Sequence, residues 1–207
     1  MAIAKQPTEI FMCNTSNIDS MRHGRPQTVM LAEVNIPTAL QGELPNGVIV
    51  KLGDTKETTQ LPEFDHVHST AAVGSNVDGA IGKFIIVSPE IKVEQYRRID
   101  NSIANHMLVA NETYTAYELQ LRDRIEYSQA YFDTTTQATL ADKALAQGLI
   151  GNNTLFDMNE NGELVAGGTS LRIVSVRYQR KPLMMAHGAD GLGLGGEVAM
   201  VKVEVVK

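Results

Sequence analysis

Short strand-like segments separated by turn residues constrain the fold of this chain more than any other feature. Turn signals stand at Pro45-Asn46-Gly47, at Arg122-Asp123 and at 159–162 (NENG), because Asn, Asp and Gly adopt the backbone angles that close tight turns. Strand-like segments lie between them at 28–34, 48–52, 80–87, 113–121, 124–128, 171–178 and 197–206. We therefore expect a mainly β fold, an antiparallel sandwich or barrel with one or two short helices.

Alternation within these segments predicts strand faces and pairings. In 113–121 (TYTAYELQL), one face carries Thr115, Tyr117, Leu119 and Leu121. The turn at Arg122-Asp123 then predicts that 124–128 runs back as a hairpin partner. In the last strand, Val201, Val203 and Val205 line one face. Residues 135–147 predict one short helix that stops at Gly148.

Composition changes divide the chain into an arm and a body. Residues 1–27 are polar, lack a hydrophobic period and are broken by prolines and a glycine, so we expect an extended N-terminal arm that is loosely ordered or laid on a neighbour. Residues 28–207 are expected to form a single β-rich domain. Within it, 89–110 predicts an excursion, either a short helix or irregular chain, because helical spacing there is interrupted by asparagines.

Bulk composition excludes several classes of function. The net charge is −6, and basic residues are scattered apart from a local group at Arg172, Arg177, Arg180 and Lys181, so nucleic acid is not expected as a partner. Cys13 is the only cysteine, which rules out an intramolecular disulfide and a cysteine zinc cluster. No apolar run is long enough to cross a membrane, and no signal peptide is expected at the N-terminus.

The stretch 191–196 (GLGLGG) matches the dinucleotide fingerprint G-x-G-x-x-G. That fingerprint requires a helix opening at the third glycine and a second strand beyond it. Here the fingerprint is followed by a strand-like segment, so we expect no nucleotide and no other cofactor. The stretch is interpreted as a loop whose apolar side chains, Leu192 and Leu194, are candidate partner contacts, together with Ile10 and Phe11 of the arm.

Two stretches carry residues that bind metal ions elsewhere. His66 and His68 are two residues apart, so on a strand they share a face and could begin a zinc or nickel site, although no third ligand is evident. Asp157, Asn159 and Asn161, followed by Gly162, imitate the first half of an EF-hand calcium loop. The bidentate glutamate of that loop would fall on Gly168, so a polar hairpin turn is the favoured interpretation and no metal is expected.

The sequence contains none of the short catalytic motifs that can be recognised from neighbouring residues. There is no G-x-S-x-G elbow, no H-E-x-x-H pair and no phosphate-binding G-x-x-x-x-G-K-[ST] loop. A glycosidase-like pair of carboxylates stays open, because its spacing exists only in the folded chain. We expect a protein that is not an enzyme.

Several stretches, taken in order, resemble decoration or cement proteins, which bind outside the capsid shell of tailed bacteriophages. The order is NGVIVKLGD, FIIVSPE, YTAYELQLRDRIEYSQAYFD, KALAQGLIGNNTLFDMNENGELVAGG and a final pair of long strands, over roughly residues 44–206. The resemblance implies a β-rich body without a catalytic site, made in the host cytoplasm and carried on the exterior of the virion. It carries over no individual functional residue.

Three hypotheses follow. The first is a virion structural protein that binds and stabilises the lattice of the major capsid protein, a role that is compatible with a homo-oligomer. The second is a tail or connector component of the same kind of particle. The third is a metal- or sugar-binding β-domain or hydrolase, for which His66→Ala and His68→Ala are the discriminating variants.

Overall fold

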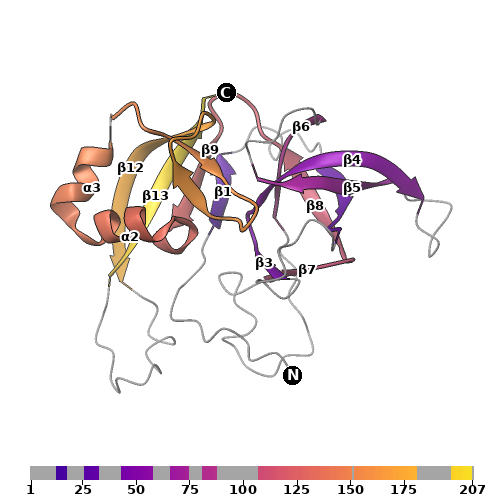
Figure 1. The fold of residues 1–207 in the computed structure, drawn as a ribbon, viewed down its shortest axis with the longest axis horizontal. Coiled ribbons are helices and arrows are strands. Elements are labelled where there is room, and N and C mark those ends of the chain that lie inside the picture. Colours follow the sequence, from indigo (N-terminus) through magenta and orange to yellow (C-terminus); the bar gives the residue numbers. More distant parts are fainter. Residues whose placement is uncertain are drawn as a thin grey trace, which may run out of the picture.

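A computed structural model of the chain describes residues 13–17, 26–32, 43–57, 66–74, 81–87, 107–150, 152–180 and 197–206. Over these residues the protein is mainly β, as the sequence predicts. In Figure 1 a sheet flanked by two short helices lies on the left and the strands of a small barrel lie on the right. The expected alternatives, sandwich or barrel, therefore occur as a closed barrel beside an open sheet.

The barrel is formed by four strands from the first half of the chain and by β8, just beyond its midpoint. Its strands close in the order β2-β5-β4-β6-β8, and every pairing is antiparallel except that of β2 with β5. Their bounds are β2 Pro26–Met30, β4 Ile49–Glu57, β5 His66–Val73, β6 Ile81–Ile86 and β8 Thr113–Glu118. A two-stranded ladder of β3 (Glu43–Pro45) and β7 (Met107–Val109) accompanies it.

The six-stranded sheet combines one early strand with strands from the second half of the chain. Its order is β1-β9-β13-β12-β10-β11, and all its pairings are antiparallel. The strands are β1 Cys13–Asn17, β9 Arg124–Ser128, β10 Leu155–Met158, β11 Leu164–Ala166, β12 Leu171–Arg180 and β13 Glu197–Val205. Cys13–Asn17, with Pro26 and Gln27 of β2, falls in the predicted arm; these residues are extended, and they pair with β9 and β8 of the body.

Two short helices take the place of the single helix expected over 135–147. A 3-10 turn, η4 (Gln129–Tyr131), is followed by α2 (Thr134–Ala141) and α3 (Lys143–Leu149). Asp142 separates the helices because it is extended and its carboxylate caps α3, accepting from the backbone N–H of Ala144 at 2.8 Å. Gly148 lies inside α3 and does not terminate it, which corrects the predicted stop.

The turn at Arg122-Asp123 does not make the expected hairpin. It is a tight turn, with Asp123 N–H donating to Gln120 O at 3.0 Å and Arg122 at φ 75°. The strands on its two sides belong to different units, because β8 pairs with β2 and β6 whereas β9 pairs with β1 and β13. At this crossing turn the chain passes from the barrel to the six-stranded sheet.

Burial along β8 alternates, and the face predicted to carry Thr115 and Tyr117 is the less buried one. Tyr114 and Ala116 are the buried residues of this strand, and β8 ends at Glu118. Of the two leucines predicted on that face, Leu119 is buried after the strand and Leu121 is 66% exposed in the turn. In β13, by contrast, Val201, Val203 and Val205 are all buried, consistent with the face predicted for them.

The barrel and the sheet share one continuous hydrophobic cluster. The β10–β11 hairpin reaches the barrel, as Figure 1 shows, and Ile49 N–H donates to Met158 Sδ at 3.1 Å. A Cβ atom at Gly74, after β5, would lie only 2.7 Å from Met158 O, so backbone meets backbone there. These contacts join the two units over the described residues.

Candidate functional site

Most of the predicted metal and contact residues lie where the structure does not describe their side chains. His66 and His68 both lie on β5, so the condition for a shared face is met, and their side chains are outside what the structure describes. Leu192, Leu194, Ile10 and Phe11 also lie outside the described residues, as do 191–196 and most of 89–110. Among the described residues, no group of three or more His, Cys, Asp or Glu is placed to hold a metal ion.

Residues 157–162, which resemble half of a calcium loop, form a hairpin turn. Their side-chain oxygens accept hydrogen bonds from backbone N–H groups. Asp157 is buried, and its carboxylate accepts from the N–H of Thr169 at 3.0 Å and of Ser170 at 2.9 Å. Asn159 Oδ1 accepts from the N–H of Asn161 at 3.0 Å and of Glu163 at 2.8 Å. The oxygens of Asp157 and Asn159 are therefore engaged in structural hydrogen bonds, and the favoured interpretation of a polar hairpin turn is confirmed.

A buried cluster joins the sheet to the barrel at the Asn46-Gly47 turn. Tyr127 Oη donates to Gly47 O at 2.9 Å, Tyr131 Oη donates to Asn46 O, and the two rings lie 4.7 Å apart. Cys13 on β1 completes the cluster, since a Cβ atom built on Gly47 would approach its Sγ to 2.6 Å. Burial is the main cause that raises the pKa of both phenols, and it also raises the pKa of the Cys13 thiol. The cluster is a protonated, structural junction.

The outer face of the six-stranded sheet carries alternating charges on three adjacent strands. We use "outer face" for Arg124 and Glu126 of β9, Lys202 and Glu204 of β13, and Arg172 and Arg177 of β12. Register places them on one side, because Arg124 and Arg172 both stand opposite Glu204, and Glu126 stands opposite Lys202. The other side of the same strands carries the buried residues Ile125, Tyr127, Val201 and Val203.

Two carboxylates of the outer face are covered by arginine side chains. Glu204 accepts from Arg124 at 2.9 Å and from Arg172 at 2.7 Å. Arg177 reaches across β13 to make a two-pronged pair with Glu126, at 2.5 and 2.8 Å. The glutamate side chains are about 10% exposed, whereas the three arginines are 45–55% exposed. Burial alone would raise the pKa of Glu204, but the hydrogen bonds from Arg124 and Arg172 outweigh it and lower the pKa.

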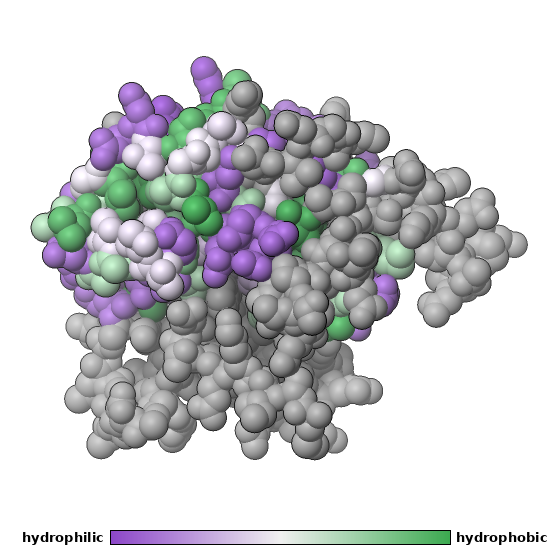
Figure 2. Space-filling view, viewed as in Figure 1, coloured by the Kyte–Doolittle hydropathy of each residue, from purple (hydrophilic) through white to green (hydrophobic). Residues whose placement is uncertain are grey.

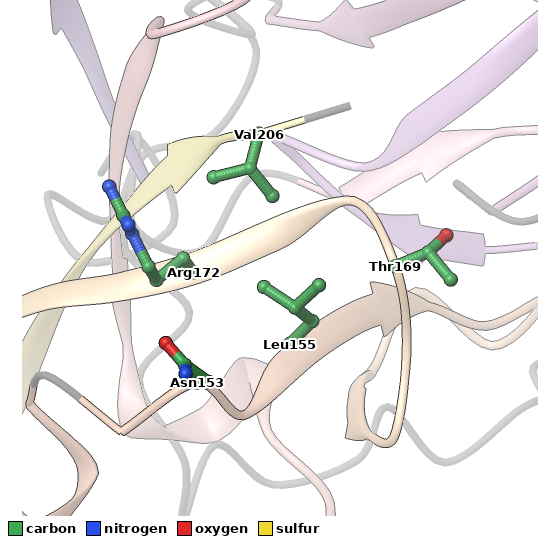
Figure 3. Close-up of a pocket in the computed structure, with 5 residues that line it drawn as sticks. All are labelled: Asn153, Leu155, Thr169, Arg172 and Val206. Carbon is green, nitrogen blue, oxygen red and sulfur yellow. The ribbon is translucent and has the colours of Figure 1, made fainter.

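An open pocket of about 380 Å³ adjoins the outer face where β10 and β12 begin and β13 ends. Figure 3 shows the side chains of Leu155 and Val206 pointing toward each other, with Arg172 and Asn153 on one side and Thr169 on the other. Arg172 thus belongs both to the ion pairs and to the pocket wall. The pocket has an apolar floor, one guanidinium group, one amide and one hydroxyl.

Apolar side chains on the rest of the described surface are dispersed. The most exposed are Leu121 in the crossing turn, Leu145 on α3 and Val165 on β11, which lie on separate elements. Figure 2 accordingly shows hydrophobic and hydrophilic residues interspersed over α2, α3 and the sheet. In the parts of the chain that the structure describes, no helix has the length and apolar character needed to cross a bilayer.

Comparison of the chain with protein family models, with curated proteins and with solved structures found no match. The candidate site is therefore defined by the residues of this chain alone.

Sequence reasoning missed the outer face and the pocket. The signal was present as alternation of charged and apolar residues in 124–128 (RIEYS), 171–178 (LRIVSVRY) and 197–206 (EVAMVKVEVV). In the sequence alone, the local group at Arg172 and Arg177 shows only a concentration of charge. Its pairing with Glu126 and Glu204 depends on the order β9-β13-β12, which no local pattern contains.

Proposed function

We propose that this chain is a non-enzymatic structural protein of a tailed bacteriophage particle, a β-rich subunit that binds and stabilises the assembled capsid shell from outside. The proposal is supported by what the reactive side chains of the described residues do. Asp157, Glu126, Glu204, Tyr127 and Tyr131 all hydrogen-bond to other parts of the chain and hold its elements together. This use of polar groups suits a rigid scaffold that binds through its surface.

Such a protein would act by mass action. If it binds the assembled lattice and not the free shell subunit, it shifts the assembly equilibrium toward the shell. The order of strand and turn segments that resembles decoration proteins supports the same assignment. The proposed location is the outer surface of the head, in contact with the major capsid protein.

The test uses heads of the phage that encodes the chain, purified from a mutant that lacks it. We expect the added protein to bind these heads stoichiometrically and to raise the temperature at which they release DNA. We expect it not to bind unassembled shell protein. Failure to bind heads, or equal binding to free subunits, would contradict the proposal. Labelled protein found on tails of intact particles, or filaments formed by the purified protein, would favour a tail or connector component.

A further inference from the structure

The outer face is positively charged on an acidic protein. It carries four cationic side chains and two carboxylates, a net charge of +2, whereas the whole chain has a net charge of −6. The two carboxylates lie underneath, and the guanidinium groups that cover them are about half exposed. An approaching partner therefore meets the positive ends of the ion pairs first.

The arginines of this face are already held in place. Arg124 donates to Glu204 through Nε and Nη2, and Arg177 donates to Glu126 through the same two nitrogens. Among the described residues, Arg172 donates only through Nη2, to Glu204, so its Nε and Nη1 remain for another acceptor beside the pocket. A second carboxylate binding there would lose little conformational entropy from the arginine.

The pocket adds an apolar contact next to these charges. Leu155 and Val206 form its floor, and the uncharged polar groups of Asn153 and Thr169 stand at its rim. A branched aliphatic side chain would fill such a floor, while a carboxylate nearby in the same segment would reach Arg172.

We propose that the outer face and its pocket bind an acidic polypeptide segment that carries an aliphatic side chain. This inference rests on the proposed function and assigns the surface by which the protein docks on the shell. A net charge of +2 is small for a continuous phosphate backbone, which carries a negative charge at every nucleotide. The face as described also carries no aromatic side chain on which a base would stack.

Asn153 offers the sharpest test, because it is exposed at the pocket rim and makes no side-chain hydrogen bond among the described residues. We expect Asn153→Glu to weaken binding to the protein-free heads about fivefold and Asn153→Lys to bind at least as tightly as the wild type. The matched control is Gln147→Glu, an exposed position on α3, which lies on the other side of the sheet. It adds the same charge away from the pocket and should leave binding unchanged.

The outcomes separate the two proposals. Equal binding of both Asn153 variants and the wild type would overturn the docking surface and leave the proposed function standing. No binding of any of these proteins to heads would overturn both. A labelled single-stranded oligonucleotide is the remaining probe. If the protein binds it and Asn153→Glu weakens that binding, the partner of this face is a nucleic acid and not an acidic polypeptide.

Discussion

Gly47 occupies a position that no other residue fits. Its φ of 90° lies in the left-handed region, and a Cβ atom there would come within 2.6 Å of Cys13 Sγ and 2.7 Å of Cys13 Cβ. We expect Gly47→Ala to lower the free energy of unfolding by about 2 kcal/mol or more, since backbone strain and overlap with β1 add. Urea unfolding monitored by circular dichroism measures this change.

The matched control is a glycine in a permissive place. Gly148 lies inside α3, and a Cβ atom there would meet nothing within 4 Å. Gly148→Ala should therefore raise the free energy of unfolding by roughly 0.5–1 kcal/mol, because alanine favours the helix. Equal effects of the two substitutions would contradict the structure of the Asn46-Gly47 turn.

Glu204 gives the protein a predictable sensitivity to acid. Its pKa is lowered in the folded state, below the ordinary value of 4.5, by hydrogen bonds from Arg124 and Arg172 that outweigh burial. A lowered folded-state pKa contributes stability that is present above pH 4.5 and is lost as the pH falls through the folded-state value. We expect thermal melts to show this loss in the wild type and a weaker pH dependence in Glu204→Gln. If Glu204→Gln lost stability at low pH as the wild type does, other carboxylates would control the acid sensitivity.

The β10–β11 hairpin depends on Asp157 for its closure and not on calcium. Asp157→Ala removes the acceptor of two backbone N–H groups, so we expect a loss of about 2 kcal/mol in the free energy of unfolding. Glu160→Ala, at an exposed turn position, should be neutral. Added Ca²⁺ should leave the Tm of the wild type unchanged, and a rise would revive the calcium-loop hypothesis.

Turns of this chain were predictable, whereas the partners of its strands were not. The signals at Asn46-Gly47, Arg122-Asp123 and 159–162 all mark turns, because turn chemistry is local. Only the last of them joins two strands that pair with each other, β10 and β11. The other two lead into different sheets, since pairing is decided by residues far apart in sequence. The charged outer face escaped prediction for the same reason.

At the scale of the whole molecule, the barrel is inserted between the first two neighbouring strands of the sheet. β1 is the edge strand of the sheet, and its Cys13 enters the junction with Tyr127 and Gly47. Deleting residues 1–17 would uncover the edge of β9 and this cluster. We expect the Tm to fall by about 10 °C and the purified protein to associate through the open edge.

Light scattering during size-exclusion chromatography measures that association. The control is deletion of residues 1–9, which leaves β1 in the chain and should have a much smaller effect on Tm. A deletion of residues 1–17 that keeps the full Tm would contradict the role of β1 in the sheet.

The same insertion predicts the order in which the molecule folds. β1 and β9 are more than a hundred residues apart in the chain, so pairing them directly closes a very long loop. Once the barrel forms, however, Pro26 at the start of β2 lies opposite Tyr117 near the end of β8. Only residues 18–25 and 119–123 then separate β1 and β9 from the closed barrel, which lowers the entropy loss of pairing by roughly 2 kcal/mol.

Refolding kinetics should therefore separate the two units. Val50→Ala in the barrel core is expected to slow refolding, whereas Cys13→Ala on β1 should mainly speed unfolding. The reverse pattern in a stopped-flow chevron would mean that the sheet forms first. With the barrel first, a newly made chain brings its distant β1 and β9 segments together as near neighbours, and the sheet assembles at the rate of a short loop.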